Sequence, residues 1–532
     1  MLGAVVFLVL LIACANVANL LSAQAAARQK EMALRISIGA GRARLLQLLF
    51  IECLLLASTA TILGTIFAAW SAPFVVQMIN PPDDPLRLHM PADWRVLAFS
   101  AAMALGVTVL FGLAPATRAC RVQPVSALKG GDDPHARRRL MNALVAAQVA
   151  FCFLVHFTAG LFVATFERLS SQPIGFDATN LLTVEAESRM YGKDRTRPQQ
   201  NWQNAADQLR TLPGVQATAI AGWTLMSGNG WTSTIRVAGH TIHDNEPYFL
   251  GVSPRFFETI RIPLIDGREF NHTDKHPTVD ANDQPVEGVA IVNESFARAF
   301  FDGANPIGKT FERLDRKNIP VRTLIVGCVR DARYRDMREP LRPVAYSPLS
   351  GKDWATILVR TSNTNAAANA AQIRKLVSQS QPDLRVTNIV PQSEIVRGHT
   401  IRERLLATLS LFFAILALIL AAVGLYGVLN YSVLQRKREL GIRIALGARS
   451  AHVVTQVASS VFFMLILGSA AGLIAGLAGE RFLRTLLFEV EATDPRLLVT
   501  PFLTIFAAAC LAAIPPVLAA ARTDPATALR SE

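Results

Sequence analysis

Charged residues and cysteines are both scarce in this chain of 532 residues. Charged residues make up 17% of it, whereas a soluble globular protein carries about 25%. Apolar residues make up 51%, which argues against an intrinsically disordered chain and against an ordinary cytosolic enzyme. Six cysteines are too few for a disulfide scaffold. The net charge of +13 leaves two interpretations open, a nucleic-acid partner or the basic loops of a membrane protein.

Motifs for catalysis and metal binding are missing as well. The sequence contains no C-x-x-C, H-E-x-x-H or G-x-S-x-G pattern, which mark thiol–metal sites, metalloproteases and serine hydrolases. One phosphate-loop pattern is matched, by Gly303–Thr310, but such a loop needs a buried strand before it and a helix after it. Because Glu294–Phe301 predicts a helix before it, we interpret the match as a turn with an exposed lysine. We expect no enzyme activity, cofactor or metal site.

The sequence contains several long apolar stretches. Seven stretches reach the length of about 20 residues that a helix needs to cross a bilayer, and a polar block, 166–404, separates the fourth from the fifth. We therefore predict an α-helical integral membrane protein with a large extracytoplasmic domain. The seven predicted spans are residues 2–23, 46–70, 96–117, 141–165, 405–431, 455–479 and 497–521.

Lysine and arginine collect in alternate loops, as they do in cytoplasmic loops. Four segments together hold 18 basic and 6 acidic residues, namely 24–44, 118–140, 432–456 and 522–532. The intervening loops, 71–94 and 480–496, hold 4 basic and 7 acidic residues. This alternation predicts a cytoplasmic C-terminus and an extracytoplasmic block 166–404, and it explains most of the net charge without nucleic acid. Residue 1 then falls outside, where a chain normally needs a preceding span.

The sequence contains an internal repeat. Arg28–Ala40 aligns with Arg436–Ala448 at an offset of 408, and Arg121–Lys129 aligns with Arg522–Arg530 at an offset of 401. A unit of three predicted spans therefore occurs twice in the chain. Both copies of the loop place Glu and Arg four residues apart, the favoured order for an ion pair on a helix, and end on a glycine.

Each repeated loop predicts a short, basic, amphipathic helix on the cytoplasmic side. Two interpretations stand, a helix that lies on anionic lipid or one that docks a cytoplasmic partner, and duplication of the whole loop favours docking. The candidate coupling residues are Arg28, Glu31, Arg35, Gly39, Arg436, Glu439, Arg443 and Gly447.

Four polar residues inside the predicted spans are candidate sites, because amide and ionisable groups are costly in a membrane. Asn16 and Asn19 share one face of the first span, Glu52 lies near the cytoplasmic end of the second, and His156 lies deeper in the fourth. Helix packing is the simpler role for all four, and transport chemistry is the alternative.

The outer block reads as mixed α and β structure. A strand–helix–strand pattern occurs twice and predicts a ferredoxin-like pair of βαβ units, split by a β-rich insertion at about 224–355. Five phenylalanines in the insertion, Phe256, Phe257, Phe296, Phe300 and Phe301, are interpreted as core. The six segments are Leu181–Glu187, Gln199–Leu212, Val215–Ala221, Ile357–Thr361, Ala366–Ser380 and Leu384–Val390.

The doubled loop pattern, R-x-x-E and then R-x-x-x-G-A, resembles the FtsX-like permease domain of MacB-type ABC transporters. Segments 13–19 (ACANVAN) and 421–429 (AAVGLYGVL) and the terminal P-x-x-A-L are similar to that domain too. The outer block resembles the MacB periplasmic core domain, in which a stretch like Asn305–Lys309 is common. Two permease units in one chain resemble the duplicated orphan permeases (ADOP). That family would carry a further span and outer domain before residue 1, so we expect an N-terminally shortened member.

The resemblance implies four parts: a first permease unit (1–130), a linker with the fourth span (131–165), a periplasmic core domain (166–404) and a second permease unit (405–532). It also implies an inner-membrane subunit that works as a dimer or pseudo-dimer, with a separate cytoplasmic ABC ATPase, the lipid bilayer and a periplasmic protein as partners. The repeated loops would couple ATP hydrolysis to the outer domain, for efflux or mechanotransmission. The alternatives are a membrane-anchored sensor or scaffold without ATP coupling, and an inactive truncated permease.

Overall fold

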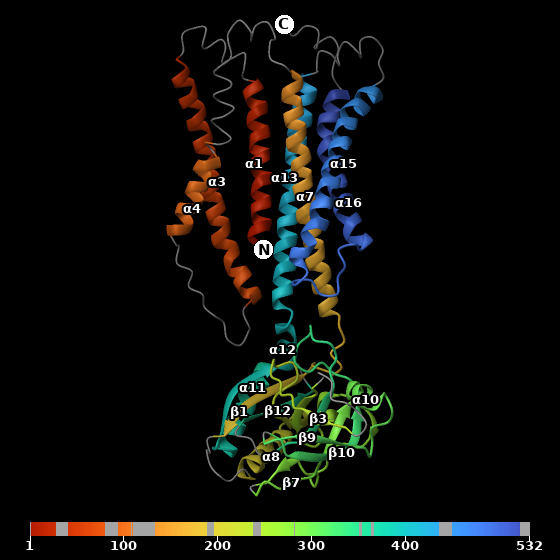
Figure 1. Ribbon diagram of the computed structural model, residues 1–532. Coiled ribbons are helices and arrows are strands. Elements are labelled where there is room, and N and C mark those ends of the chain that lie inside the picture. Colours follow the sequence, from red (N-terminus) through yellow and green to blue (C-terminus); the bar gives the residue numbers. More distant parts are fainter. Residues whose placement is uncertain are drawn as a thin grey trace. The chain divides into compact units, whose positions relative to one another are not determined.

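The computed structural model of the protein describes residues 2–27, 41–79, 94–107, 109, 134–188, 196–237, 246–280, 282–315, 317–350, 354–362, 366–435 and 450–521. The chain divides into two compact units (Figure 1). The helical unit comprises Met1–Asn80, Asp84–Arg168 and Arg402–Glu532, and the sheet unit comprises Pro81–Asp83 and Leu169–Ile401.

Every predicted span falls on a helix of the helical unit, the third only in part. Among the described residues, five helices are long and apolar enough to cross a membrane, through Phe50–Val76, Met141–Ser170, Ile401–Val433, Val461–Leu483 and Pro495–Ala519. The first helix has a shorter apolar stretch, Gly3–Val17. The helices are α1 (Leu2–Ala27), α3 (Arg42–Ile79), α4 (Trp94–Val107), α7 (Pro134–Ser170), α13 (Ile401–Gln435), α15 (Ser450–Leu483) and α16 (Pro495–Ala521).

Helix α7 is the most buried of the five candidate spans. Within its most apolar stretch 56% of the residues are buried, whereas in that of α3 none are. Val149, Phe153 and Phe157 of α7 belong to an apolar core that also takes in residues of α1, α13, α15 and α16. The helices of this unit are therefore organised around α7 in the described part of the chain, and α3 contributes little to the core.

Three glycines of α15 bring its backbone close to α7. Gly468, Gly472 and Gly476 recur every four residues, which places them on one face of the helix. A Cβ atom on Gly468 would lie 2.6 Å from the Ala146 carbonyl oxygen, and one on Gly472 would lie 2.7 Å from that of Ala150. Such small residues permit close helix packing in membranes, and we call this set the α15 stripe.

As far as its residues are described, the sheet unit is built on eleven strands in the order β13-β1-β12-β2-β4-β11-β8-β10-β9-β3, with β5 paired to β10. The two βαβ units predicted from the sequence supply β13, β1, β12 and β2, which all pair antiparallel. The elements of these units are β1 (Leu181–Ser188), α8 (Thr196–Arg210), β2 (Val215–Ala221), β12 (Trp354–Thr361), α11 (Ala366–Ser380) and β13 (Leu384–Pro391).

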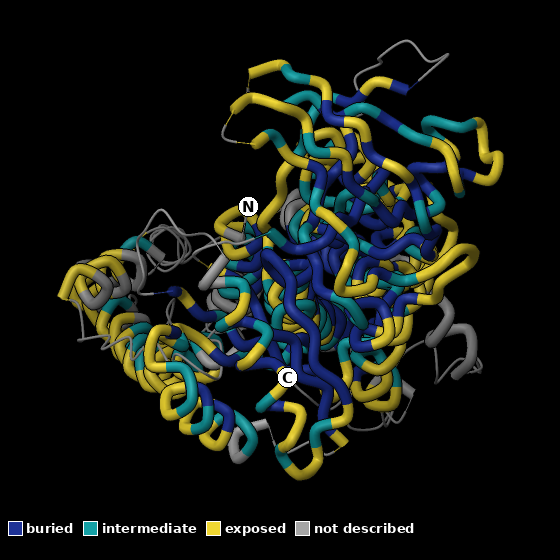
Figure 2. Tube along the Cα trace, turned by 90° about the horizontal axis from the view of Figure 1, so that it is seen from below, coloured by how far each residue is buried: buried dark blue, intermediate teal, exposed yellow. Residues whose placement is uncertain are grey.

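Helices α8 and α11 cover the same face of these four strands. Trp202 and Leu209 of α8 and Ile373 and Val377 of α11 share one apolar core with residues from all four strands, among them Val184. Buried residues accordingly dominate the central strands of the sheet (Figure 2), and in β12 every residue but the first is buried.

The predicted insertion extends the same sheet, and short helices flank its strands. Here β4 pairs parallel with β11, and β8 pairs parallel with β10. Its elements are β3 (Ile235–Arg236), β4 (Tyr248–Val252), α9 (Phe256–Ile260), β5 (Leu264–Gly267), β6 (Thr278–Val279), β7 (Pro285–Val286), β8 (Gly288–Asn293), α10 (Glu294–Phe301), β9 (Thr310–Leu314), β10 (Pro320–Val329) and β11 (Val344–Pro348); β6 and β7 form a separate pair, and α12 (Gln392–Gly398) follows β13.

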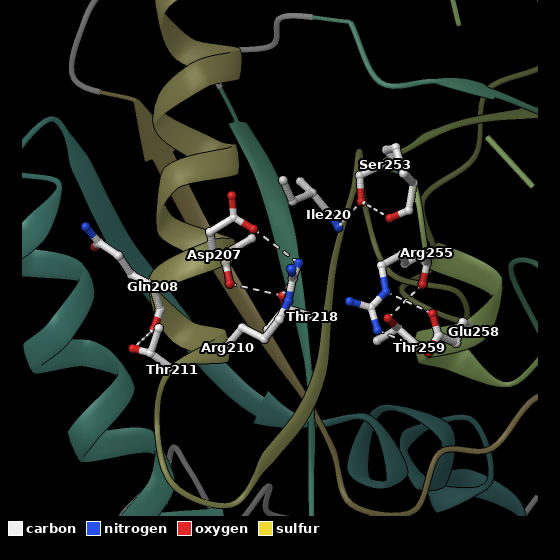
Figure 3. A network of polar contacts seen from close by, with 12 residues as sticks. Asp207, Gln208, Arg210, Thr211, Thr218, Ile220, Ser253, Arg255, Glu258 and Thr259 are labelled. Atoms are coloured by element: carbon white, nitrogen blue, oxygen red, sulfur yellow. Dashed lines mark hydrogen bonds and ion pairs between the residues drawn. The ribbon is translucent and has the colours of Figure 1, made fainter. Parts of the chain in front are cut away.

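The two halves of the sheet meet between β2 and β4, where the strand register contains only the pair Ala221–Val252. Ser253 reinforces this junction, since its hydroxyl accepts a hydrogen bond of 2.8 Å from the Ile220 N–H (Figure 3). The Ser253 N–H in turn donates to the Ile220 carbonyl at 2.8 Å. Side-chain and backbone bonds thus join the insertion to the four-stranded part.

Two predictions for the insertion are confirmed. Phe256, Phe257 and Phe296 are buried, and Phe300 and Phe301 pack against the core of this half. The phosphate-loop match lies between helix α10 and strand β9, which is the reverse of the strand–loop–helix order that phosphate binding requires. The Lys309 ammonium lies 4.8 Å from the centre of the Phe301 ring. The match is therefore a turn whose lysine packs against the last residue of helix α10.

Candidate functional site

A buried polar cluster joins three helices of the helical unit. The Asn16 side-chain amide of α1 donates to the Leu420 carbonyl of α13 at 2.5 Å. The Gln148 amide of α7 donates to the Asn16 side-chain oxygen at 2.8 Å and to the Leu420 carbonyl at 3.0 Å. Asn16 is 4% exposed and Gln148 is 1% exposed. Hydrogen bonds between helices compensate the cost of burying such amides, and we call this cluster the polar node.

The polar node fits against α13 because residue 424 is a glycine and has no side chain. A Cβ atom on Gly424 would lie 2.0 Å from the Asn16 Oδ1 atom and 2.7 Å from both polar atoms of the Gln148 amide. The repeat offset of 408 pairs Asn16 with Gly424. Equivalent positions of the two repeats therefore touch, as residues near a two-fold axis do.

Two other predicted intramembrane residues, Glu52 and His156, belong to other parts of the helical unit. Glu52 is half-exposed on α3, and Asn19 belongs to α1, but its side chain lies outside the described residues. The Nδ1 atom of His156 lies 3.0 Å from the Cys152 carbonyl oxygen of its own helix. Within the part of the chain that the structure describes, no three His, Cys, Asp or Glu side chains are grouped to hold a metal.

The eight residues proposed from the sequence for the coupling loops lie outside the described residues. They stay a prediction, namely Arg28, Glu31, Arg35, Gly39, Arg436, Glu439, Arg443 and Gly447.

Sequence reasoning missed Gln148 and Gly424. Gln148 is an uncharged amide in the fourth span, and Gly424 is one glycine among many. The sequence did contain a signal for Gly424, because the repeat alignment at an offset of 408 pairs it with Asn16. Nothing of this kind marks Gln148, whose helix lies outside the repeated unit.

We expect Gly424→Ala to destabilise the helical unit by about 2 kcal/mol, because the new methyl group displaces the Asn16 side chain from the polar node. Asn16→Ala removes the obstruction, so the double variant is expected to lose about 1 kcal/mol less than the sum of the single losses. The measurement is a double-mutant cycle of thermal unfolding in detergent. If the stability losses of the two single variants added up to the loss of the double variant, the contact between Asn16 and Gly424 would be contradicted.

Family models match both units of the chain. The model described as "FtsX-like permease C-terminal" matches twice, at residues 3–124 and 411–525. The MacB-like periplasmic core domain matches residues 143–376. The protein is thus a multi-pass inner-membrane permease with a large periplasmic domain. It belongs to the MacB/FtsX-type permeases of ABC transporters.

Curated relatives are similar at low identity. The chain is 24% identical over 328 residues to the macrolide export ATP-binding/permease protein MacB of Burkholderia thailandensis, covering 60% of this chain and 48% of the relative. It is 24% identical over 319 residues to the pyoverdine export ATP-binding/permease protein PvdT of Pseudomonas syringae, covering 58% and 46%. The chain spans about half the length of the curated relatives that it matches.

A solved structure of the periplasmic region of MacB from Actinobacillus actinomycetemcomitans is similar to 43% of this chain and covers 96% of that region. The sequence identity is 18% and the TM-score is 0.27.

Proposed function

We propose that the protein couples ATP hydrolysis by a separate cytoplasmic ATPase to movement of its periplasmic domain, for efflux or for transmission of mechanical work. The observation that carries the proposal is the double match to the FtsX-like permease model, one match for each repeat. Both repeats contain a basic loop with the same Glu–Arg pattern. The names of the relatives join an ATP-binding part to a permease part, and this chain resembles the permease part.

We further propose seven spans, a cytoplasmic C-terminus and the division into 1–130, 131–165, 166–404 and 405–532. The alternation of basic and acidic loops supports the orientation, and helices at all seven predicted positions support the spans. The strand order β13-β1-β12-β2 with two helices on one face supports a ferredoxin-like pair split by the insertion. The contact of Asn16 with Gly424 supports a pseudo-dimer made by the two permease units of one chain.

The repeated loops are proposed as the docking elements for the ATPase. Each would present a basic amphipathic helix with an internal ion pair, Glu31–Arg35 in the first copy and Glu439–Arg443 in the second. Docking of both copies would let closure of the ATPase change the distance between the permease units. The helices α1 and α13, which precede the loops, meet at the polar node, so this distance change would act there.

We expect the double variant Glu31→Lys/Glu439→Lys to lower co-purification of the ATPase about tenfold, because charge reversal breaks the ion pair within each proposed docking helix and changes the charge that the helix presents to the partner. The measurement is the ratio of ATPase to permease after affinity purification of the tagged permease from membranes. The control, Glu480→Lys/Glu489→Lys, makes the same charge change in the last turn of α15 and in the loop that follows it, on the predicted outer side. Retained ATPase in the loop variant, or equal loss in the control, would contradict docking through these loops.

A further inference from the structure

Two short connections join the sheet unit to candidate spans. The first runs from the end of α7 at Ser170 into β1, and the second runs from α12 through His399 to the start of α13 at Ile401. Ile174 lies just beyond α7, and His399 lies just before α13. Both residues belong to the sheet unit, so the contacts that they make with its loops are contacts within one compact unit.

Residues 331–339, which we call the junction strap, contact the first connection through their backbone. The junction strap follows β10 and precedes β11, so it belongs to the insertion half of the sheet. The Arg333 N–H donates to the Ile174 carbonyl at 2.9 Å. Gly175 has a φ of 83°, and a Cβ atom there would lie 2.3 Å from the Asp331 carbonyl oxygen. Glycine permits both this conformation and this close approach of two backbones.

The junction strap contacts the second connection through His399. The Nε2 atom of His399 lies 2.6 Å from the Met226 carbonyl oxygen, which can only accept, so Nε2 carries the proton. The Met226 N–H in turn donates to the Tyr334 carbonyl of the junction strap at 2.7 Å. The other ring nitrogen, Nδ1, lies 3.9 Å from the Asp336 carboxylate. His399 therefore meets the junction strap directly at Asp336 and indirectly through Met226.

Its own side chains brace the junction strap. The Arg333 guanidinium donates to the carbonyls of Met337 at 2.7 Å and of Glu339 at 2.6 Å. The Tyr334 hydroxyl donates to the Phe249 carbonyl of β4 at 2.9 Å, and both Tyr334 and Met337 are buried. A loop that is packed by its own side chains moves as one body.

We propose that the junction strap ties the ends of α7 and α13 to each other and to the insertion half of the sheet. Its contacts with Ile174 and with His399 then open together, because a braced loop cannot leave one connection and keep its place at the other. Under the proposed function, on which this role rests, the junction strap makes the insertion half follow both spans. The tie itself needs no ATPase, so it is tested on the permease alone and its outcome is separate from that of the proposed function.

The test is amide hydrogen exchange of the full chain in detergent, measured by mass spectrometry at one pH. His399→Ala removes the contact beside α13. We expect the Arg333 N–H, which bonds to Ile174 beside α7, to exchange about fivefold faster in this variant, because the tie loses one hydrogen bond at its other end. His399→Gln is expected to restore most of the protection, since the glutamine amide can donate to the Met226 carbonyl.

The matched control is His276→Ala. The Nδ1 atom of His276 lies 2.8 Å from the carbonyl oxygen of Pro348, so this variant also removes a histidine that contacts a backbone carbonyl, but at the end of β11. Exchange at Arg333 is expected to stay unchanged. If His399→Ala speeds exchange throughout β12 as well, Asp336→Ala takes its place. It removes only a carboxylate that is 46% exposed, and about twofold faster exchange at Arg333 is expected.

Two results would overturn the proposal. In His399→Ala, faster exchange of residues 392–401 without a change at Arg333 would show that the two connections are held independently. Equal acceleration at Arg333 in the His276 control would show a general loosening of the sheet unit and not the release of the junction strap.

Discussion

Gly472→Leu is expected to prevent α15 from packing on α7 and to abolish most of the folded helical unit. The first side-chain atom alone would lie 2.7 Å from the Ala150 carbonyl oxygen and from the Phe153 Cβ atom. The first of these is backbone and cannot move without displacing α7, which is the most buried of the candidate spans. Overpacking of this kind costs about 3 kcal/mol or more.

The measurement for Gly472→Leu is the fraction of extracted protein that elutes as a single species, together with its thermal midpoint in detergent. The matched control is Gly479→Leu on the same helix, where no described atom lies within 4 Å of the added Cβ. Gly472→Ala is expected to be intermediate. If Gly472→Leu matched the control in yield and midpoint, the close contact of α15 with α7 would be wrong.

Arg360→Met is expected to destabilise the sheet unit by about 3 kcal/mol. Arg360 lies on β12 and is 3% exposed. Its guanidinium donates to the backbone carbonyls of Thr259 at 2.6 Å, Asp177 at 2.7 Å and Thr179 at 2.9 Å. Methionine leaves all three carbonyls without this donor, and the nearby Asp177 carboxylate loses its buried partner.

The control for Arg360→Met is Arg261→Met. The Arg261 guanidinium pairs with the same Asp177 carboxylate at 2.7 Å, but its side chain is 57% exposed, so its loss should cost at most about 1 kcal/mol. Denaturant unfolding of the full chain, followed by the fluorescence of the tryptophans in the sheet unit, compares the two variants. Equal losses for both would show that the buried position of Arg360 is unimportant.

Asp177 also gives this prediction a pH dependence. Burial raises the pKa of the Asp177 carboxyl, but hydrogen bonds from Thr179 and the charge of Arg360 outweigh burial and hold the pKa below its usual value. A depressed pKa stabilises the fold above the carboxyl pKa of the unfolded chain, and this contribution is lost as the pH falls through the lower pKa of the folded state. Arg360→Met is therefore expected to weaken the acid sensitivity of the sheet unit, whereas the loss at neutral pH persists.

Much of the local structure of the outer block was predictable from short-range patterns. Val215–Ala221 and Ala366–Ser380 were predicted with the bounds that β2 and α11 have, because alternation and helical periodicity are properties of neighbouring residues. The strand order of the insertion was not predictable in the same way. Its connection to the other strands includes one register pair and the hydrogen bonds of Ser253, which are made by residues that carry no distinguishing pattern.

The sequence by itself determined that helices long enough for a membrane flank a polar block. The length of a span and the charge of a loop follow from counting residues that are consecutive in the chain. It also determined the duplication, since equivalent loops can be aligned without coordinates. Only the tertiary structure decided what the duplicated surfaces contact: Asn16 meets Gly424, and the α15 stripe packs on α7. Such contacts join residues hundreds of positions apart, and whether a small residue is covered depends on the shape of its neighbours and not on its own identity.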